Sequence, residues 1–182
     1  MSSSHRCQRG FTLIESLTSL GIVAILTVVA IPSFSNIQNN ARRRHSVDNF
    51  WHAIFLARNE AIKRNSVVVL CKSGGGTRCD NSPGNWAAGW IVFDNLDHDE
   101  PAQVDDGEPV LRIYNATEQI AVTSNRQTFA FRPVAQGAVN GTIVFCDARG
   151  SSEARAIIIS HTGRPRTSTK DASNKPLDCP IT

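Results

Sequence analysis

Cationic side chains gather near the C-terminus, where their chemistry suits an anionic ligand. The segment from Arg149 to Lys170 holds one acidic residue, Glu153, and five basic ones. The basic residues are Arg149, Arg155, Arg164, Arg166 and Lys170. A guanidinium group is a planar fork that can hydrogen-bond two phosphate oxygens at once, so the segment is predicted to bind phosphate groups. An ordinary solvated arginine loop is the alternative interpretation.

Two of these arginines flank a proline in the run Gly163-Arg164-Pro165-Arg166. Because proline fixes φ, we expect a stiff turn that holds both guanidinium groups close together. Residues 147–182 contain no Phe, Trp or Tyr, so base stacking is not expected. Binding would then depend on phosphates, without sequence preference and with a strong loss of affinity in salt. The second basic run, Arg42–Arg44, is another candidate for phosphate binding, but a structural role in which it pairs with neighbouring carboxylates is favoured.

Acidic side chains dominate residues 94–108, which contain seven carboxylates and no Lys or Arg. Asp94, Asp97 and Asp99 could offer oxygen ligands to calcium, but their spacing is not that of an EF-hand, so a solvated loop is favoured. The chain has no G-x-S-x-G, H-E-x-x-H or Walker phosphate-binding motif, and its histidines do not fall at ligand spacing. We therefore expect no enzymatic activity, no metal and no cofactor.

The composition fits one globular domain with an appendage. The chain has 182 residues, 41% of them hydrophobic and 19% charged, with a formal net charge of +3, which excludes a disordered polyelectrolyte. The appendage is the apolar stretch Phe11–Ile31, whose only ionisable residue is Glu15. A helix of that length spans about 30 Å, the thickness of the hydrocarbon core of a bilayer. The sequence therefore predicts a single membrane span over residues 11–32.

The start of this stretch, Arg9-Gly10-Phe11-Thr12-Leu13-Ile14-Glu15, resembles the class III leader junction of type IV pilins and type II secretion pseudopilins. The resemblance implies that a prepilin peptidase removes the leader, residues 1–10, by cutting between Gly10 and Phe11, and that Phe11 is N-methylated. It also implies a bacterial inner-membrane protein with a periplasmic C-terminal part. After assembly the protein would lie in a pilus or pseudopilus, beside other major and minor pilin subunits.

Glu15 is predicted to be an assembly residue. Placing a carboxylate in the hydrocarbon core of a membrane costs free energy, so such a group usually has an interaction partner and a function. The resemblance to pilins implies that this partner is the free N-terminal amine of a neighbouring subunit. A lone carboxylate that reaches to the membrane surface is the alternative.

Apolar residues at three- and four-residue steps continue from Phe34 to Ala61, which predicts one helix from Phe11 to Arg64, bent at Pro32. Residues 33–65 would be its amphipathic half. Short β-branched or aromatic runs follow, and they predict strands at Val67–Cys71, Trp86–Phe93, Val110–Tyr114, Ile120–Thr123, Gln127–Arg132, Thr142–Cys146 and Ala156–Ser160. One long helix followed by strands predicts an α+β fold, with antiparallel sheet packed on the helix and a β-rich periplasmic head over residues 66–182.

Removal of the leader would take Cys7 away and leave four cysteines, an even number in an oxidising compartment. Disulfides are favoured over zinc because these cysteines have neither a C-x-x-C pair nor a close histidine. Of the three possible connectivities we favour Cys71–Cys79, which closes the loop that holds Gly74–Gly76, together with Cys146–Cys179. The second bond would pin the C-terminal tail onto a strand.

Further features resemble the FimT/GspH family of minor pilins and pseudopilins over nearly the whole chain. They are Ala57-Arg58-Asn59-Glu60-Ala61, Val69-Leu70-Cys71-Lys72-Ser73, and Trp86 followed by Gly89-Trp90-Ile91-Val92-Phe93. Gly163, Arg164 and Arg166 match the Gly-Arg-x-Arg motif of FimT proteins linked to DNA uptake in natural transformation, in which the arginines contact DNA. The resemblance implies a minor type IV pilin that binds the DNA phosphate backbone, with Arg149, Arg155 and Lys170 as further contacts. The alternative is a structural minor pilin, or a GspH-type pseudopilin of type II secretion, that does not bind DNA.

Replacing Glu15 by leucine should leave the protein folded and inserted in the membrane but should lower its incorporation into fibres. The change removes the charge that would pair with a neighbouring amine and keeps the hydrophobic span. Immunoblots of sheared-fibre and membrane fractions measure the distribution, and Ser16→Ala serves as the control for a nearby polar substitution. Normal incorporation of the Glu15→Leu protein would contradict the pairing role.

Overall fold

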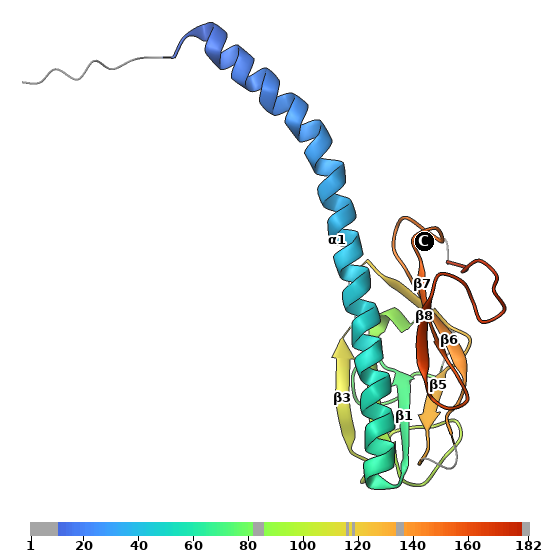
Figure 1. Ribbon diagram of the computed structural model, residues 1–182. Helices are drawn as coiled ribbons and strands as arrows, with labels where there is room; N and C mark the ends of the chain where they lie inside the picture. The colour runs from blue at the N-terminus through green and yellow to red at the C-terminus, as the bar shows by residue number, and fades with distance from the viewer. Residues whose placement is uncertain (1–10, 82–85, 116, 118, 134–136, 180–182) are drawn as a thin grey trace, which may run out of the picture. The chain divides into compact units, whose positions relative to one another are not determined.

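The computed structural model describes residues 11–81, 86–115, 117, 119–133 and 137–179, with the backbone alone at 29–32. Within these residues the chain forms a long helix, α1 (Leu13–Arg64), and eight strands (Figure 1). The strands are β1 (Val67–Lys72), β2 (Gly89–Asn95), β3 (Val110–Asn115), β4 (Ala121–Ser124), β5 (Thr128–Phe131), β6 (Gly141–Cys146), β7 (Arg155–Ile159) and β8 (Pro165–Ser168). A short 3-10 helix, η1 (Trp86–Ala88), precedes β2. The chain divides into two compact units, one up to Asn39 and one from Asn40 onward, which is called the head below.

The first unit is the apolar half of α1. The hydroxyl of Thr12 caps the helix by accepting a hydrogen bond from the backbone N–H of Glu15 at 3.3 Å. The large apolar side chains from Phe11 to Val28 are each 55–83% exposed, and the helix is long and apolar enough to cross a membrane by length and composition. Gly10 and the rest of the predicted leader lie outside the described residues.

The end of α1 is set by local chemistry. Asn65 follows the last helical residue with a positive φ of 53°, and the N–H of Ser66 reaches back to the carbonyl of Ala61 at 3.3 Å. This closing arrangement satisfies carbonyl groups that the helix leaves unpaired. Lys63 and Arg64 in the last turn add a favourable interaction with the helix dipole.

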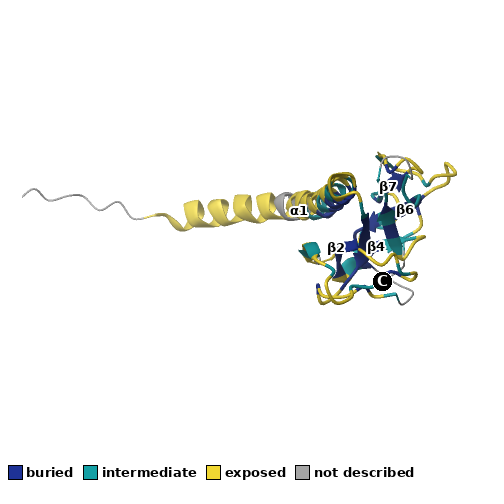
Figure 2. Cartoon of the chain, turned by 90° about the horizontal axis from the view of Figure 1, so that it is seen from below, coloured by how far each residue is buried: buried dark blue, intermediate teal, exposed yellow. Residues whose placement is uncertain are grey.

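The head contains two four-stranded antiparallel sheets, with strand orders β3-β2-β1-β5 and β4-β6-β7-β8. We call them sheet A and sheet B. Residues of both sheets share one hydrophobic core with α1, and buried residues gather where the helix faces the strands (Figure 2). The predicted α+β fold, with a long helix packed on antiparallel sheet, is what the structure shows.

Phe50 of α1 lies at the centre of this core. Its ring is completely buried and meets four other rings edge-on, with centroids 5.2–6.1 Å away. The four rings belong to Trp86, Trp90, Phe129 and Phe145. Because Trp90 and Phe129 lie in sheet A and Phe145 lies in sheet B, this single side chain connects the helix to both sheets.

Two elements differ from the sequence prediction. Trp86–Ala88 was predicted as strand but forms η1, where the indole N–H of Trp86 donates to the carbonyl of Arg126 at 3.2 Å. The strand β2 begins only at Gly89, whose φ is 117°. The strand β8 was not predicted, because its residues Pro165–Ser168 have no apolar pattern. It lies at the edge of sheet B, where proline at the first position is tolerated.

Both disulfide pairings expected from the sequence are present. Cys71 of β1 bonds to Cys79, and Cys146 of β6 bonds to Cys179. The second bond ties the segment after β8 back to sheet B across 33 residues of sequence. Long cross-linked loops lose conformational entropy in the unfolded state, so this bond stabilises the C-terminal part of the head.

Replacing Phe50 by alanine should lower the free energy of unfolding of the head by about 3–5 kcal/mol, the usual cost of removing a buried aromatic ring. Phe55→Ala is the matched control, because Phe55 lies on the same helix but is 44% exposed. Denaturant unfolding of the full-length protein in detergent, followed by tryptophan fluorescence, measures both values. Equal losses in the two variants would show that Phe50 does not connect the sheets.

Candidate nucleic-acid interface

The predicted Gly-Arg-Pro-Arg motif begins in the turn of the β7–β8 hairpin. Gly163 is buried at a φ of 71°, and a Cβ there would lie 3.2 Å from the Cβ of Ala138 and 3.4 Å from a ring carbon of Phe131. Any other residue would therefore be strained and crowded. The N–H of Gly163 donates to the carbonyl of Ser160 at 2.9 Å, and the N–H of Ser160 donates to the carbonyl of Arg164 at 3.1 Å.

The second half of the motif, Pro165-Arg166, lies on the strand β8 and not in the turn. Arg166 belongs to β8 and pairs with Ile158 of β7. Alternation along an extended backbone directs Arg164 and Arg166 to the same side, about 6.6 Å apart at about 3.3 Å per residue. The pairing of Ser160 with Arg164 extends the ladder, so β8 replaces the expected stiff turn as the element that spaces the two guanidinium groups.

Arg164, Arg166 and Lys170 are all exposed. Among the described residues, no carboxylate lies within 4.0 Å of their cationic nitrogens. Their charges are therefore open to an anionic ligand along the free edge of sheet B. Of the six predicted DNA contacts, these three side chains together with the Gly163 turn form one continuous segment.

Arg155 lies on the other side of sheet B. It pairs with Phe145, which faces the core, so its side chain is directed towards α1. There it lines a hollow of about 230 Å³ together with Arg43 and Arg44 of the helix. Its guanidinium also donates to the carbonyls of Glu153 at 3.3 Å and Ala154 at 2.8 Å. The structure therefore separates Arg155 from Arg164 and Arg166.

Arg149 is held by a buried acid. Its guanidinium contacts both carboxylate oxygens of Asp147, at 3.0 Å and 2.6 Å, and donates to the side chain of Asn40 at 2.9 Å. Arg43 of α1, which is 5% exposed, also pairs with Asp147 at 3.1 Å. The charge of Arg149 is therefore compensated within the head, and this group connects the loop after β6 to the helix.

Burial by itself would raise the pKa of Asp147. The hydrogen bonds from the Arg149 side chain and backbone, and the charges of Arg149 and Arg43, outweigh burial and hold the pKa below its ordinary value. Asp147 is therefore ionised at neutral pH, with its charge stabilised by two arginines.

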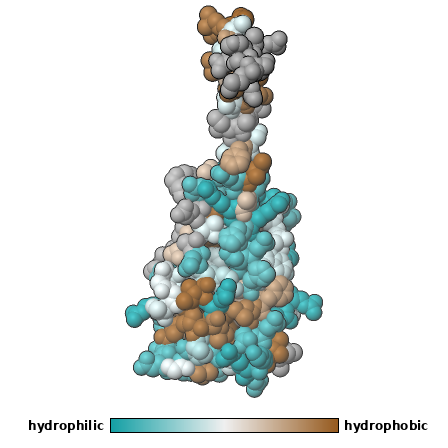
Figure 3. All heavy atoms as spheres, turned by 90° about the vertical axis from the view of Figure 1, so that its left-hand side faces the viewer, coloured by the Kyte–Doolittle hydropathy of each residue, from teal (hydrophilic) through white to brown (hydrophobic). Residues whose placement is uncertain are grey.

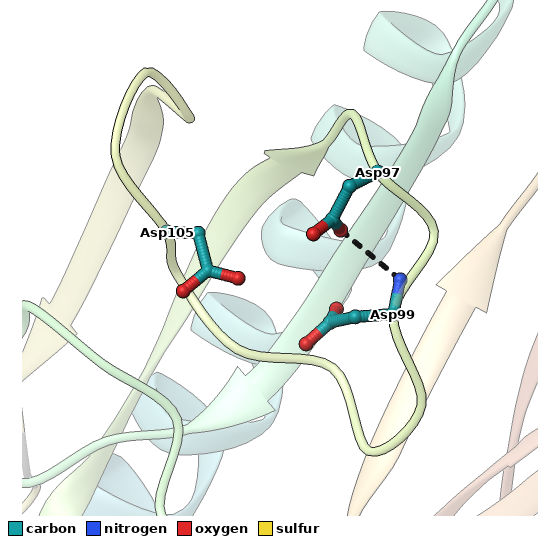
Figure 4. Close-up of side chains that lie close together, drawn as sticks. All are labelled: Asp97, Asp99 and Asp105. Atoms are coloured by element: carbon teal, nitrogen blue, oxygen red, sulfur yellow. Dashed lines mark hydrogen bonds between the residues drawn. The ribbon is translucent and has the colours of Figure 1, made fainter.

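The acidic loop brings together a different trio from the one considered in the sequence. Carboxylate oxygens of Asp97, Asp99 and Asp105 lie within 4.8 Å of one another (Figure 4). Asp94 is buried in β2, where it bonds to Ser66 and pairs with Arg64 at 3.4 Å. The third member of the trio is Asp105, which lies eight positions after Asp97 in the sequence. The spacing of the acidic residues gives no indication that Asp105 would lie beside Asp97 and Asp99.

The trio can offer one oxygen each to a hard divalent cation. Its carboxylates also hold the loop itself: Asp99 accepts the N–H of Gln103 at 3.0 Å, and Asp97 accepts the N–H of Asp99 at 3.1 Å. Burial, followed by the charges of Asp97, Asp105 and Glu108, raises the pKa of Asp99. The solvated loop and the calcium site both stay predictions.

The long N-terminal helix and the two antiparallel sheets packed on it are the fold of a pilin-like protein. Residues 5–31 match the prokaryotic N-terminal methylation motif, and residues 46–163, more than half of the chain, match the family described as type II transport protein GspH. The chain belongs to this GspH family, as the sequence resemblance predicted. No curated protein matches the sequence.

The fold is also that of solved minor pilins. A crystal structure of the type IV minor pilin FimU from Pseudomonas aeruginosa PAO1 superposes with a TM-score of 0.53 at 15% identity, covering 75% of this chain and 98% of FimU. A second crystal form of FimU gives a TM-score of 0.53 at 14% identity, covering 80% of this chain and 97% of FimU. At such identity the likeness establishes the fold and leaves the arginine edge to be argued on its own geometry.

Asp147→Asn should lower stability at pH 7 by about 3 kcal/mol, because Arg43 and Arg149 lose their buried carboxylate partner and keep the more exposed Glu153, at 3.5 Å and 3.9 Å. The carboxyl has a lowered pKa in the folded state and about 3.9 when unfolded, so its stabilisation is present above pH 4 and is lost as pH falls through the folded-state pKa. The unfolding free energy of the variant should therefore depend less on pH below 4 than that of the wild type. Denaturant unfolding between pH 2 and pH 7, at about one-unit steps, measures both.

Asp106→Asn, at an exposed position, is the control and should follow the wild-type pH profile. Parallel profiles for the wild type and the Asp147→Asn protein would show that the Arg43–Asp147–Arg149 group does not stabilise the fold.

Proposed function

We propose that the chain is a minor type IV pilin whose head binds the DNA phosphate backbone, without sequence preference, for uptake in natural transformation. The observation that carries the proposal is the uncompensated charge of Arg166 on the edge strand β8 and of Arg164 just before it. Elsewhere in the head, buried or half-buried arginines such as Arg43 and Arg149 are paired with Asp147. Charges that serve stability are compensated, whereas those on β8 are left open to solvent.

The edge strand suits a long polyanion. An edge leaves one side of the strand free, so a DNA backbone can run along β8 and meet Arg164, Arg166 and Lys170 in order. Each guanidinium can donate two hydrogen bonds to one phosphate group. Residues 147–182 hold no aromatic side chain, so this surface contacts phosphates and not base faces.

The negative charge of the acidic loop, residues 94–108, should weaken DNA binding at the turn end of the β7–β8 hairpin. Gly163 packs against Phe131, and the next residue, Arg132, lies 4.0 Å from a carboxylate oxygen of Glu100. At the turn, the arginine-bearing hairpin and the acidic loop are therefore neighbours. Repulsion between exposed charges is screened beyond about 10 Å in 0.1 M salt, so the contact should be strongest towards Lys170.

The N-terminal part of the proposal concerns assembly. The methylation motif over residues 5–31 supports cleavage after Gly10 by a prepilin peptidase and methylation of Phe11. The apolar half of α1 would hold the protein in the bacterial inner membrane before assembly and pack among other pilin subunits afterwards. Glu15, in its first turn, would pair with the amine of a neighbour. A structural subunit of this kind needs no catalytic site, and we propose none.

A second candidate is a pseudopilin of type II secretion that does not bind DNA. The description of the matched family, type II transport protein GspH, favours it directly. Both candidates share the helix, the sheets and the N-terminal motif. The arginines of β8 are the feature that separates them.

Arg164→Gln combined with Arg166→Gln should weaken DNA retention by the full-length protein in a gel-shift assay at low salt. Three phosphate contacts predict that log affinity falls with log salt at a slope of about −3, and removal of two contacts should reduce the slope to about −1. Titrations of a fluorescent DNA fragment at several salt concentrations measure both slopes.

The matched control is Arg78→Gln combined with Lys63→Gln, which removes the same charge from two exposed positions outside the hairpin. Its binding should stay close to that of the wild type. Equal retention by the β8 double variant and the wild type, or no retention by the wild type at low salt, would favour the secretion pseudopilin.

A further inference from the structure

Two basic features of the sequence meet in one hollow of the head, between α1 and sheet B. Arg44 belongs to the basic run on the helix, and Arg155 belongs to the basic segment near the C-terminus. The hollow has a volume of about 230 Å³. Its described lining consists of Arg43, Arg44, Val47, Asp48, Arg155 and Thr167.

The parts of the chain that form the hollow, residues 33–81 and 137–179, are described without a gap. The described tail after β8 is fixed on the other face of sheet B. Its last residue, Cys179, is bonded to Cys146, which packs with Ala156 in a cluster separate from the core shared with α1. The helix and the strands β7 and β8 therefore define the hollow.

Arg44 and Arg155 carry the open positive charge of the hollow. In the part of the chain that the structure describes, no carboxylate oxygen lies within 4.0 Å of their guanidinium nitrogens. Arg155 is oriented by two backbone carbonyl groups, which leave its charge in place. Arg43 beside them differs, because Asp147 compensates its charge at 3.1 Å.

The positive charges around the hollow repel one another. Burial lowers the pKa of Arg43, the carboxylate of Asp147 opposes this effect, and the charge of Arg155 lowers the pKa further. Asp48 lies one helical turn after Arg44, and among the described residues no basic nitrogen lies within 4.0 Å of its carboxylate. Two open guanidinium groups and one carboxylate leave an excess of positive charge, which an anion between the arginines would relieve.

The donors of the hollow suit a phosphate group. They come from three elements: Arg44 from α1, Arg155 from β7 and the hydroxyl of Thr167 from β8. The oxygen atoms of a phosphate group point in several directions and can accept from donors on different sides, whereas a carboxylate has two oxygens in one plane. The volume is several times the roughly 30 Å³ of a water molecule in the liquid, so one such group fits with some of its water.

The hollow lies on the helix side of the strand that carries the motif arginine. Thr167 pairs with Ile157, whose side chain lies in the core, so the Thr167 side chain points to the same side of sheet B. Arg166 is the preceding residue and points to the opposite side. In the sheet that the described residues form, β8 is an edge strand, so a ligand that crosses this edge meets donors on both faces.

The other flank of the head is less suited to a polyanion. In Figure 1 the strands β3 and β8 lie on opposite sides of the head part of α1. Figure 3 displays the β3 flank, and apolar side chains gather in its lower part. The edge at β8 therefore offers the more favourable path for a phosphate backbone.

We propose that the hollow binds one phosphate group of the DNA backbone between Arg44 and Arg155, while Arg164 and Arg166 bind phosphates on the other face of β8. The inference rests on the proposed function, because it adds a contact to the same DNA surface. DNA then lies across the edge of sheet B and not on its outer face alone. Arg155, which the strand separates from the motif arginines, takes part in binding from the helix side.

Arg44→Gln combined with Arg155→Gln should weaken DNA binding about tenfold in about 0.1 M salt, because the loss of one phosphate contact removes the release of about one counterion. The slope of log affinity against log salt should become shallower by about 1. Titrations of a fluorescent DNA fragment with the full-length protein in detergent measure both quantities. Lys63→Gln with Arg78→Gln is the matched control, and it should bind DNA as the wild type does.

Asp48→Asn tests the hollow without removing a hydrogen-bond donor to DNA or disturbing the contacts of Arg155. It takes a carboxylate away from an exposed position in the lining, so it should strengthen DNA binding by about threefold at low salt. In a protein that also lacks both arginines the same change should have a smaller effect, because no phosphate is held beside it.

The outcomes separate this inference from the proposed function. Unchanged affinity in the Arg44 and Arg155 variant, together with a loss in the β8 double variant, would overturn the inference alone. No DNA binding by the wild type at low salt would overturn both. Equal effects of Asp48→Asn with and without the arginines would also contradict the site. Loss of the Arg44 and Arg155 variant from fibres, with DNA binding intact, would make the hollow a contact for carboxylates of a neighbouring subunit and would overturn the inference.

Discussion

The burial of one face of α1 against two sheets is the constraint on which the rest of the head depends. Neither sheet is covered on its inner side without the helix, because the shared core contains residues of α1, sheet A and sheet B together. Phe50 makes the connection most directly, through rings that belong to both sheets. In the sheet that the described residues form, β8 pairs with β7, so the position of Arg166, and of Arg164 just before it, depends on this core through β6 and β7.

The arginines of the head differ in whether a carboxylate lies beside them. At Arg43 and Arg149 a carboxylate, Asp147, compensates the guanidinium charge, and these pairs help to fix the loop after β6 on the helix. Arg164 and Arg166 have no carboxylate within 4.0 Å among the described residues. In the proposed function, the exposed arginines at β8 and just before it are where a phosphate backbone would meet the head.

The sequence predicts the helix and most strands because their signals are local. Three- and four-residue steps of apolar side chains identify α1, and β-branched runs identify strands such as β1 and β7. It does not predict β8, which consists of Pro165–Ser168 and gains its structure from pairing with β7. It also cannot show that Arg149 is held against the helix, because this contact is made with Asn40, which is 109 residues away in the chain. The structure therefore keeps four of the six predicted DNA contacts together and separates Arg149 and Arg155 from them.

The most direct test of the central claim is native-state hydrogen exchange of the full-length protein in detergent. If α1 joins both sheets into one cooperative unit, the backbone amides of Leu70 in β1 and Ile157 in β7 should open with the same free energy, and Phe50→Leu should lower both together. If the amides of one sheet open at much lower free energy than those of the other, or if the substitution affects only one sheet, the helix does not unite them. The position of the β8 arginines would then need another explanation.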